Sequence, residues 1–285
     1  MNKLKIIGGI ILSLVLFAIP FLMFLDVLQL QSAGANKSQF TTQVEIYPDL
    51  ILLKQTEMLN TIVHVSTYFA SGSGTIINRT HNDSKNQQTK NVSIYSILTN
   101  AHVIEDRNIK ILVGADGLRG EPLFLTIDYE VIITAFRTNG KVAVCGSAVV
   151  VTESEILDLA ILTFETDVDL PVANLPSCEM LDQIRIFDEV YAVGCQLGRP
   201  PLPTDGIISS IVGTANGHIT YTSNAQIAGG SSGGGLFKKY GGHYYLIGVP
   251  FSAPFARNGQ FLPHLASAIS LVSANEMIKQ YIEEK

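Results

Sequence analysis

The sequence predicts an all-β protein, and three observations support this class. From about Val44 onward, short apolar runs rich in β-branched residues are separated by Gly, Asn, Asp and Pro, as in strands joined by turns. Hydrophobic residues are 47% of the 285 residues and charged residues 15%, so the chain is not disordered and can fill a core. Clear helical spacing occurs only near the C-terminus. Repeated short strands of this kind are typical of a sandwich or a barrel.

The pattern predicts strands that are spread along the chain after its N-terminal segment. They are Thr61–Thr67, Tyr95–Thr99, Lys141–Thr152, Glu189–Val193 and Tyr244–Val249. The almost wholly polar stretch Asn78–Ser93 is expected to be a long surface loop. The Pro-containing stretch Asp169–Ser177 is expected to connect two halves of the protein.

The last helix is expected to begin with a capping box. Ser273 would cap it, and Glu276 follows three residues later. Apolar residues then recur at helical spacing, namely Met277, Ile278, Tyr281 and Ile282.

The N-terminal segment predicts that the rest of the chain is exported across a membrane. Lys3 and Lys5 precede an uncharged run over residues 6–25, which at 1.5 Å per residue spans roughly the 30 Å of a bilayer core. We expect a single-pass membrane anchor with the lysines in the cytoplasm and the rest of the chain exported. The alternative is a signal peptide cleaved at the A-x-A sequence of residues 33–35, which would give a secreted protein. A buried soluble helix is a third and weaker alternative.

The composition limits the classes of binding partner and cofactor that can be expected. There are 19 basic and 25 acidic residues, a net charge of −6, and no basic stripe, so nucleic acid is not an expected partner. Three cysteines cannot build a disulfide framework, and we expect Cys195, after an apolar strand, to be a buried thiol. No two histidines lie at metal-ligand spacing, so no metal and no cofactor are expected. The oligomeric state stays open, and an oligomer is possible.

Ser232 is the candidate nucleophile. It lies in the segment GGSSGGGL, within which residues 230–234 fit G-x-S-G-G. A nucleophilic serine needs a tight turn whose backbone N–H groups point at the developing oxyanion, and Gly230 and Ser232 would supply these groups. A side chain at Gly230 would hinder the approach of substrate, and glycine permits the required backbone angles. Ser231 is the weaker candidate, because the turn glycines are then off by one. A flexible Gly/Ser-rich loop is the alternative reading.

His102 is the candidate general base. It follows the β-type run that ends at Thr99, so its imidazole would stand at the end of a strand and lean into a cleft. An unperturbed pKa near 6.5 suits histidine for this task. The other five histidines have no comparable setting and are expected to be structural.

Asp158 is the candidate partner of that histidine. It interrupts the apolar run ILDLAIL, and an unpaired buried carboxylate is costly, so it needs a partner. A histidine that becomes imidazolium in the transition state is such a partner. An edge-strand aspartate or a turn cap is the alternative.

Taken together, these segments resemble trypsin-like serine proteases. TNAHV, DLAIL and GSSGGGL are similar to TNxHV, DLALL and GNSGGPL of that family, and their order along the chain is the same. The similarity is closest to the high-temperature-requirement (HtrA/Deg) group and covers about residues 60–285. SGSGTII before the histidine, DEVYAVG with GIISSIV before the serine, and LIGVPFS after it also agree.

The resemblance implies a chymotrypsin-like fold, with two six-stranded antiparallel β-barrels, a C-terminal helix and the active site in the crevice between the barrels. On that basis we expect an anchor or signal segment and linker over residues 1–35, a first barrel over 44–168, a connector over 169–183, and a second barrel with the closing helix over 184–285. The chain ends soon after this helix, so no PDZ domain is expected.

The resemblance also implies a serine endopeptidase that acts on proteins or peptides, with His102, Asp158 and Ser232 as its catalytic residues. Substrate would add as a strand along Leu246–Ser252, beside Val249 and Phe251. Gln226 stands six residues before Ser232, where a trypsin-like pocket has Asp, so a small or medium apolar P1 residue is expected rather than a basic one.

Some features depart from the family pattern. Ser231 replaces its Asn, and Gly229 and Gly235 replace prolines, so the oxyanion turn is expected to be less preorganised. Two rival functions stay open: a protease-like fold used only for binding or as a chaperone, and a non-peptidase acyl hydrolase. The order His, Asp, Ser disfavours the second rival, whose nucleophile would come first.

Overall fold

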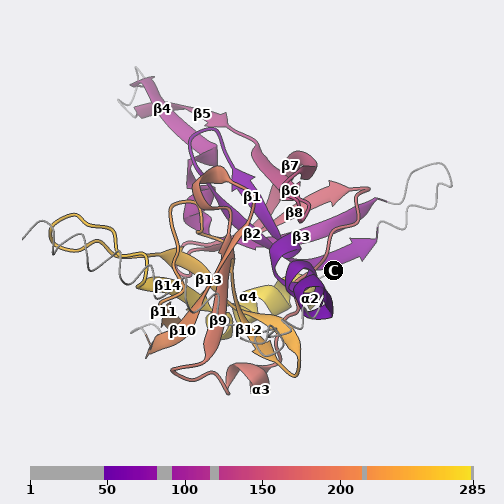
Figure 1. Ribbon diagram of the computed structural model, residues 1–285. Helices are drawn as coiled ribbons and strands as arrows, with labels where there is room; N and C mark the ends of the chain where they lie inside the picture. Colours follow the sequence, from indigo (N-terminus) through magenta and orange to yellow (C-terminus); the bar gives the residue numbers. More distant parts are fainter. Residues whose placement is uncertain (1–47, 82–91, 116–121, 214–216, 284–285) are drawn as a thin grey trace, which may run out of the picture. The chain divides into compact units, whose positions relative to one another are not determined.

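The structure consists mainly of two closed β-barrels, as expected for the all-β class. This computed structural model describes residues 48–81, 92–115, 122–213 and 217–283 (Figure 1). The expected anchor over residues 6–25, the A-x-A sequence and residues 82–91 of the polar stretch lie outside these ranges. Within the described ranges, no helix has the length and apolar character needed to cross a bilayer.

The two barrels have six strands each and the same topology. In each barrel the strands pair in the order first, second, third, sixth, fifth, fourth, and the fourth then pairs with the first. The first barrel contains β1 (Ile62–Ser66), β2 (Ser71–His81), β3 (Ser93–Thr99), β6 (Val131–Phe136), β7 (Val142–Ser154) and β8 (Leu159–Thr166). The second contains β9 (Glu189–Gly194), β10 (Leu202–Gly213), β11 (Ile219–Ser223), β12 (Gly235–Tyr240), β13 (His243–Ser252) and β14 (Ala266–Ser270).

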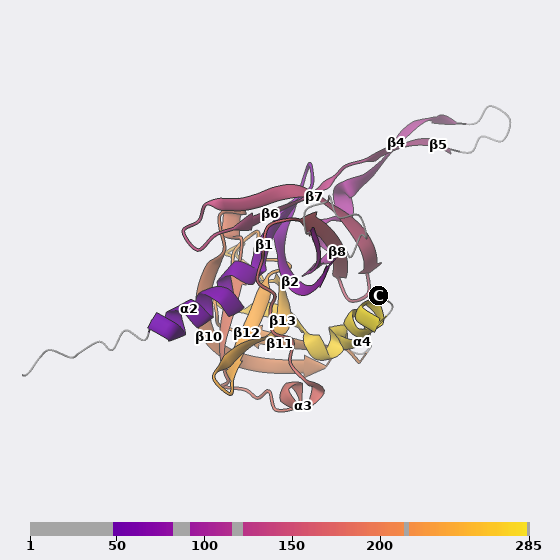
Figure 2. The ribbon, with the colours of Figure 1, turned by 90° about the vertical axis from the view of Figure 1, so that its right-hand side faces the viewer.

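The remaining elements surround the barrels. Strands β4 (Asn108–Ala115) and β5 (Pro122–Asp128) form a separate hairpin, which extends away from the first barrel in Figures 1 and 2. The helices are α2 (Pro48–Glu57), α3 (Cys178–Leu181) and α4 (Leu271–Glu283). Short 3₁₀ turns are η1 (Leu59–Thr61), η2 (Ala101–Val103), η3 (Glu105–Arg107) and η4 (Gln196–Gly198).

The alternation of side chains along strand β8 shows how the two barrels share a core. Successive side chains of a strand point to opposite faces. Leu162 and Phe164 accordingly pack inside the first barrel, whereas Leu159 and Ile161 join the apolar cluster that fills the second barrel. All four are buried. The apolar run that contains Asp158 therefore becomes a strand buried on both faces, and the barrels are fixed against each other beside the site.

Helix α4 closes this shared core. Its residues Ile278 and Tyr281 are buried in the second barrel's apolar cluster, and the Tyr281 hydroxyl lies 3.0 Å from Ser96 Oγ in the first barrel. The expected C-terminal helix is thus present, and it contacts both barrels.

The expected start of this helix is wrong by three residues, because Ser270 and not Ser273 precedes its first residue. The helix begins at Leu271, where the Val272 N–H donates to Ser270 Oγ at 3.1 Å. Ser273 lies inside the helix, and its hydroxyl instead bonds the main chain of Ile219, accepting from the N–H at 2.7 Å. The reason is that strand β14 ends at Ser270 and its pairing carries the chain directly into the helix.

Two further expectations need correction. The polar stretch 78–93 is not a loop from its beginning, because Asn78–His81 continue strand β2 and pair with Ser93–Ser96 of β3. Helix α2 was not expected from the sequence. It begins at a proline, a residue that favours the first helical position, and its Leu50 and Leu53 pack on the core.

His64 on β1 gives the folded state a pH dependence. Its Nε2 is buried without a hydrogen-bond partner in the described residues, and burial lowers the pKa of His64 below its ordinary value near 6.5. The unfolded chain therefore takes up a proton below pH 6.5 that the folded protein does not, and this group lowers stability by up to about 1.4 kcal/mol per pH unit there. Urea unfolding at pH 8 and pH 5.5 should show a smaller difference for His64→Leu than for the parent protein. An unchanged difference would contradict this role of His64.

Candidate active site

The pairing of β3 with β8 brings His102 and Asp158 to the same end of the first barrel. The two strands are antiparallel, with Thr99 opposite Ala160. His102 therefore follows the end of one strand, and Asp158 precedes the start of its neighbour. Buried Asn100 strengthens this junction, since its side-chain amide donates to the Asp158 carbonyl at 2.8 Å.

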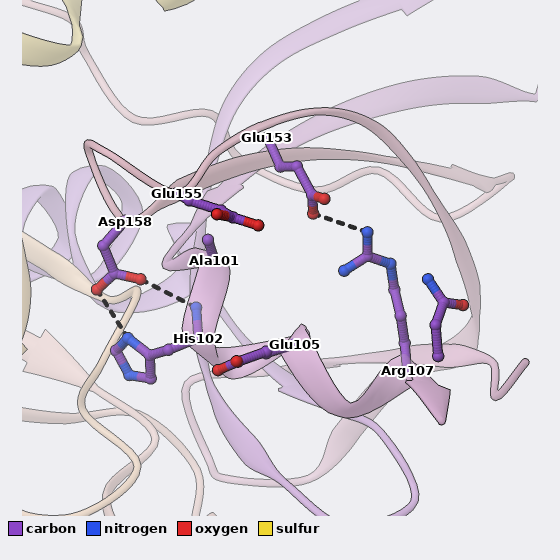
Figure 3. A pocket seen from close by; sticks show the side chains of 8 residues that line it. Ala101, His102, Glu105, Arg107, Glu153, Glu155 and Asp158 are labelled. Carbon is purple, nitrogen blue, oxygen red and sulfur yellow. Dashed lines mark hydrogen bonds and ion pairs between the residues drawn. The ribbon is translucent and has the colours of Figure 1, made fainter. Parts of the chain in front are cut away.

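Two hydrogen bonds join the Asp158 carboxylate to His102. Oδ2 lies 2.7 Å from the imidazole Nδ1, and Oδ1 accepts from the His102 main-chain N–H at 2.9 Å (Figure 3). Asp158 has a φ of +53°, a conformation that Asp tolerates better than most residues. With Nδ1 directed at a carboxylate, a neutral imidazole carries its proton on Nδ1 and leaves Nε2 as an acceptor. The aspartate is thus a paired group, as its place in an apolar run had predicted.

Ser232 lies at the junction of the barrels, on the segment that leads into β12. Its carbonyl accepts from the Ser73 N–H at 2.7 Å, and the following Gly233 packs against Thr99 and Asn100. The three residues expected to be catalytic therefore come from segments that meet at one end of the first barrel. The Ser232 hydroxyl donates to the Phe251 carbonyl at 3.3 Å, and within the described residues it makes no hydrogen bond with His102.

The neighbouring serine is placed differently. Ser231 is 2% exposed, and its Oγ accepts from the Ala228 N–H at 3.2 Å. Ser232 is only partly buried. Of the two adjacent serines, Ser232 is therefore the one accessible to a substrate.

The expected oxyanion turn has two free donors. Within the described part of the chain, neither the Gly230 N–H nor the Ser232 N–H has a hydrogen-bond acceptor. Gly230 has a φ of +93°, as its glycine had suggested. A Cβ there would lie 2.7 Å from the Cys195 carbonyl oxygen, so close packing within the protein is itself a reason for glycine at this position.

Gly233 gives a test of how tightly this turn fits the first barrel. A Cβ at Gly233 would lie 2.1 Å from the Ser73 carbonyl oxygen, and its φ is +83°. Gly233→Ala is therefore expected to destabilise the protein by more than about 2 kcal/mol and to lower activity. Gly259 is a matched control, since its φ is +82° but a Cβ there meets nothing within 4 Å. Thermal unfolding should show the larger loss for Gly233→Ala, and equal losses would contradict the tight fit.

The residues expected to contact substrate lie in different settings. Gln226 is exposed, and its carbonyl accepts from Thr204 Oγ1 at 2.7 Å. Val249 is completely buried, so its side chain faces the core. Phe251 is partly buried, and its carbonyl accepts from the Ser232 hydroxyl.

A polar pocket of about 370 Å³ lies beside the His102–Asp158 pair (Figure 3). Its charged lining includes Glu105, Glu153 and Glu155, with Arg107 paired to Glu153 at 2.7 Å. None of these four residues was expected at the site from the sequence. Their only signal was proximity along the chain to His102 and Asp158, and charged residues are common at surface turns.

Cys195 is buried as expected. It is 0% exposed, and burial raises the pKa of its thiol to about 12. A thiol of this kind is inert at neutral pH.

The two barrels, with a His–Asp pair and a serine turn at their junction, define the trypsin-like class of peptidase folds. Residues 72–249 match the model of the trypsin-like peptidase domain family, and the chain belongs to that family. No curated protein matches the sequence.

Solved structures show the same fold. The chain is 22% identical to the HtrA-type protease AlgW with a tripeptide, with a TM-score of 0.57 over 82% of this chain and 64% of that one. It is 21% identical to the serine endoprotease from Yersinia pestis, with a TM-score of 0.53 over 81% of this chain and 66% of that one. The chain thus spans less than two thirds of the length of these proteins.

Proposed function

We propose that this protein is a serine endopeptidase that hydrolyses peptide bonds through an acyl-enzyme on Ser232. The observation that carries this proposal is the Asp158–His102 pair, in which one carboxylate bonds both the Nδ1 and the main-chain N–H of the histidine. Such a pair fixes the imidazole with Nε2 free for the serine proton. Membership of the trypsin-like peptidase domain family supports the same reaction.

In the proposed reaction, His102 Nε2 accepts the Ser232 proton as Oγ attacks the scissile carbonyl. The imidazolium, stabilised by Asp158, then gives this proton to the departing amine as the C–N bond breaks. A water molecule, deprotonated by the same imidazole, then attacks the acyl carbon, and the imidazolium returns the proton to Ser232 Oγ as the ester bond breaks. Before the first proton transfer, the Ser232 hydroxyl must leave the Phe251 carbonyl and turn towards His102.

The N–H groups of Gly230 and Ser232, which have no acceptor among the residues that the structure describes, support an oxyanion hole. Both belong to the turn that carries the nucleophile, and each is available to a developing negative charge. Removing one such donor from an acyl-transfer site costs about 10²–10³ in kcat.

The proposed substrate is an extended protein or peptide segment that lies along the end of β13, where the Phe251 main chain meets Ser232. The solved AlgW structure contains a tripeptide, which fits a peptide substrate for a protein of this fold. Exposed Gln226 supplies no negative charge for a basic P1 side chain, so a small or medium apolar residue is proposed there.

A fluorophosphonate tests the nucleophile directly. The full chain is treated with the reagent, digested and analysed by mass spectrometry, with fragmentation that separates the adjacent Ser231 and Ser232. The proposal expects one adduct on Ser232 and cleavage of a peptide library by the untreated protein. No adduct and no cleavage would favour the binding or chaperone alternative, and an adduct on Ser231 would overturn the assignment.

For location, we propose that residues 6–25 anchor the protein in a membrane as a single pass, with the peptidase domain exported. The support is the sequence: an uncharged run of bilayer length that follows two lysines. Mass spectrometry of the membrane-extracted protein should find residues 1–35 present. A mature protein that lacks them would show the alternative, a secreted protein released by signal cleavage.

A further inference from the structure

The oxyanion turn contains two consecutive glycines, Gly229 and Gly230. Glycine rotates freely between conformations that other residues avoid, so this turn has little stiffness of its own. A peptide flip between the two glycines would direct the Gly229 carbonyl, rather than the Gly230 N–H, towards the oxyanion. Contacts from outside the turn must therefore hold it.

Two contacts hold the peptide planes on either side of the Gly230 Cα. The Gly229 carbonyl accepts from the Leu197 N–H at 2.7 Å, and the Gly230 carbonyl accepts from Ser73 Oγ at 2.6 Å. In a trans peptide the N–H points opposite to the C=O. The bond from Leu197 therefore fixes the direction of the Gly230 N–H, and the bond from Ser73 fixes the plane that follows.

Ser73 connects these two contacts. Its Oγ also accepts from the Cys195 N–H at 2.7 Å, and Cys195 directly precedes the 3₁₀ turn η4 that contains Leu197. Because the Cys195 N–H occupies the oxygen as a donor, the Ser73 proton is directed at Gly230. One hydroxyl thus joins the turn that holds the Gly229 carbonyl to the turn that carries the oxyanion donors.

Ser73 is itself fixed in the first barrel. It lies on β2 and is 0% exposed. Its carbonyl accepts from Thr99 Oγ1 at 2.7 Å, and its N–H donates to the Ser232 carbonyl at 2.7 Å. Ser73 therefore ties two segments of the second barrel to the strand of the first barrel that adjoins the histidine segment.

We propose that Ser73 is a positioning residue for the oxyanion hole, in which its hydroxyl keeps the Gly230 N–H directed at the developing oxyanion. This role rests on the proposed peptidase function. It also makes a competent site dependent on correct docking of the two barrels.

The test compares Ser73→Ala with Thr75→Val in the full chain. Thr75 is a matched control, because it lies on the same strand, is also 0% exposed, and its buried Oγ1 has no hydrogen-bond partner in the described residues. Ser73→Ala is expected to lower kcat about 10–100-fold, less than the outright loss of a donor, with KM within about threefold. Thr75→Val is expected to change neither.

A peptide boronate gives a readout that a loss of stability alone would not change. The boronate forms a tetrahedral adduct that uses the oxyanion hole, whereas a product peptide binds without it. In folded Ser73→Ala, affinity for the boronate should fall in parallel with kcat while affinity for the product peptide stays constant. If Ser73→Ala unfolds, Ser73→Cys replaces it in the test. Because its S–H group is a weak donor, kcat and boronate affinity should then fall by less than the amounts expected for Ser73→Ala.

The outcomes separate this inference from the proposed function. A parent protein that neither cleaves peptides nor reacts with fluorophosphonate would overturn the peptidase proposal itself. An active parent whose Ser73 variants keep the kcat and boronate affinity of Thr75→Val would overturn the role of Ser73 alone.

Discussion

Ser232→Ala is expected to lower peptidase kcat by roughly 10⁴–10⁶, the largest effect of any single substitution in this chain. The variant loses the atom that forms the acyl-enzyme, and only binding and the oxyanion donors remain. Its stability should change little, because the Ser232 hydroxyl makes a single long bond to the Phe251 carbonyl. The measurement is kcat on a cleaved library peptide, with thermal unfolding as the check on folding.

Ser231→Ala is the control next to it in the chain. Its buried hydroxyl accepts one hydrogen bond, from the Ala228 N–H, which is worth about 0.5–1.5 kcal/mol and hence at most about tenfold if all of it acts on the site. Peptidase kcat should therefore fall by no more than about tenfold. If Ser231→Ala lost as much activity as Ser232→Ala, the assignment of the nucleophile would be wrong.

The strands were the part of the fold that the sequence predicted best, because a strand at the edge of a core repeats with a period of two. Each of the five expected strands overlaps an observed one. The closure of each barrel was not visible in any single segment, since it depends on pairings such as Val63 with Ala135 between residues far apart in sequence. The resemblance to a family supplied that information instead.

The starts of the helices show that tertiary packing can override the local sequence signals for capping. Ser273 and Glu276 fit a capping box, yet the pairing of β14 through Ser270 starts the helix earlier and leaves the Ser273 hydroxyl to bond Ile219. Helix α2 was not predicted because it has only ten residues. A helix of this length is stabilised mainly by packing against the core, which the local sequence does not show.

The candidate site was predictable in its residues and less so in its contacts. A lone carboxylate in an apolar run, a histidine after a strand and a serine among glycines each have a chemical reason that can be read locally. The contact of Ser73 with Gly230 joins residues 157 positions apart across two barrels, and no local pattern indicates it. The bond from the Ser232 hydroxyl to Phe251 depends on a side-chain rotamer, which the sequence does not specify.

Asp158→Asn is expected to lower kcat by about 10⁴ while leaving the fold intact. The carboxylate now accepts from two donors of His102, the main-chain N–H and Nδ1–H. An amide offers one acceptor oxygen, so its NH₂ group must face the other donor. If the NH₂ faces Nδ1, that nitrogen becomes the acceptor and the imidazole proton moves to Nε2, the atom needed to take the serine proton. If it faces the main-chain N–H, two donors oppose each other and the histidine turn is displaced.

Glu153→Gln is the matched control for this substitution. It removes the same charge from a carboxylate that lines the same pocket, but Glu153 is paired with Arg107 rather than with His102. Exposed ion pairs of this kind contribute little, so kcat should stay within a few-fold of the parent value. Equal losses of kcat in the two variants would mean that the pocket affects catalysis through its total negative charge. A loss confined to Asp158→Asn, with a matching fall in the rate of fluorophosphonate labelling, would place the effect on the orientation and tautomer of His102.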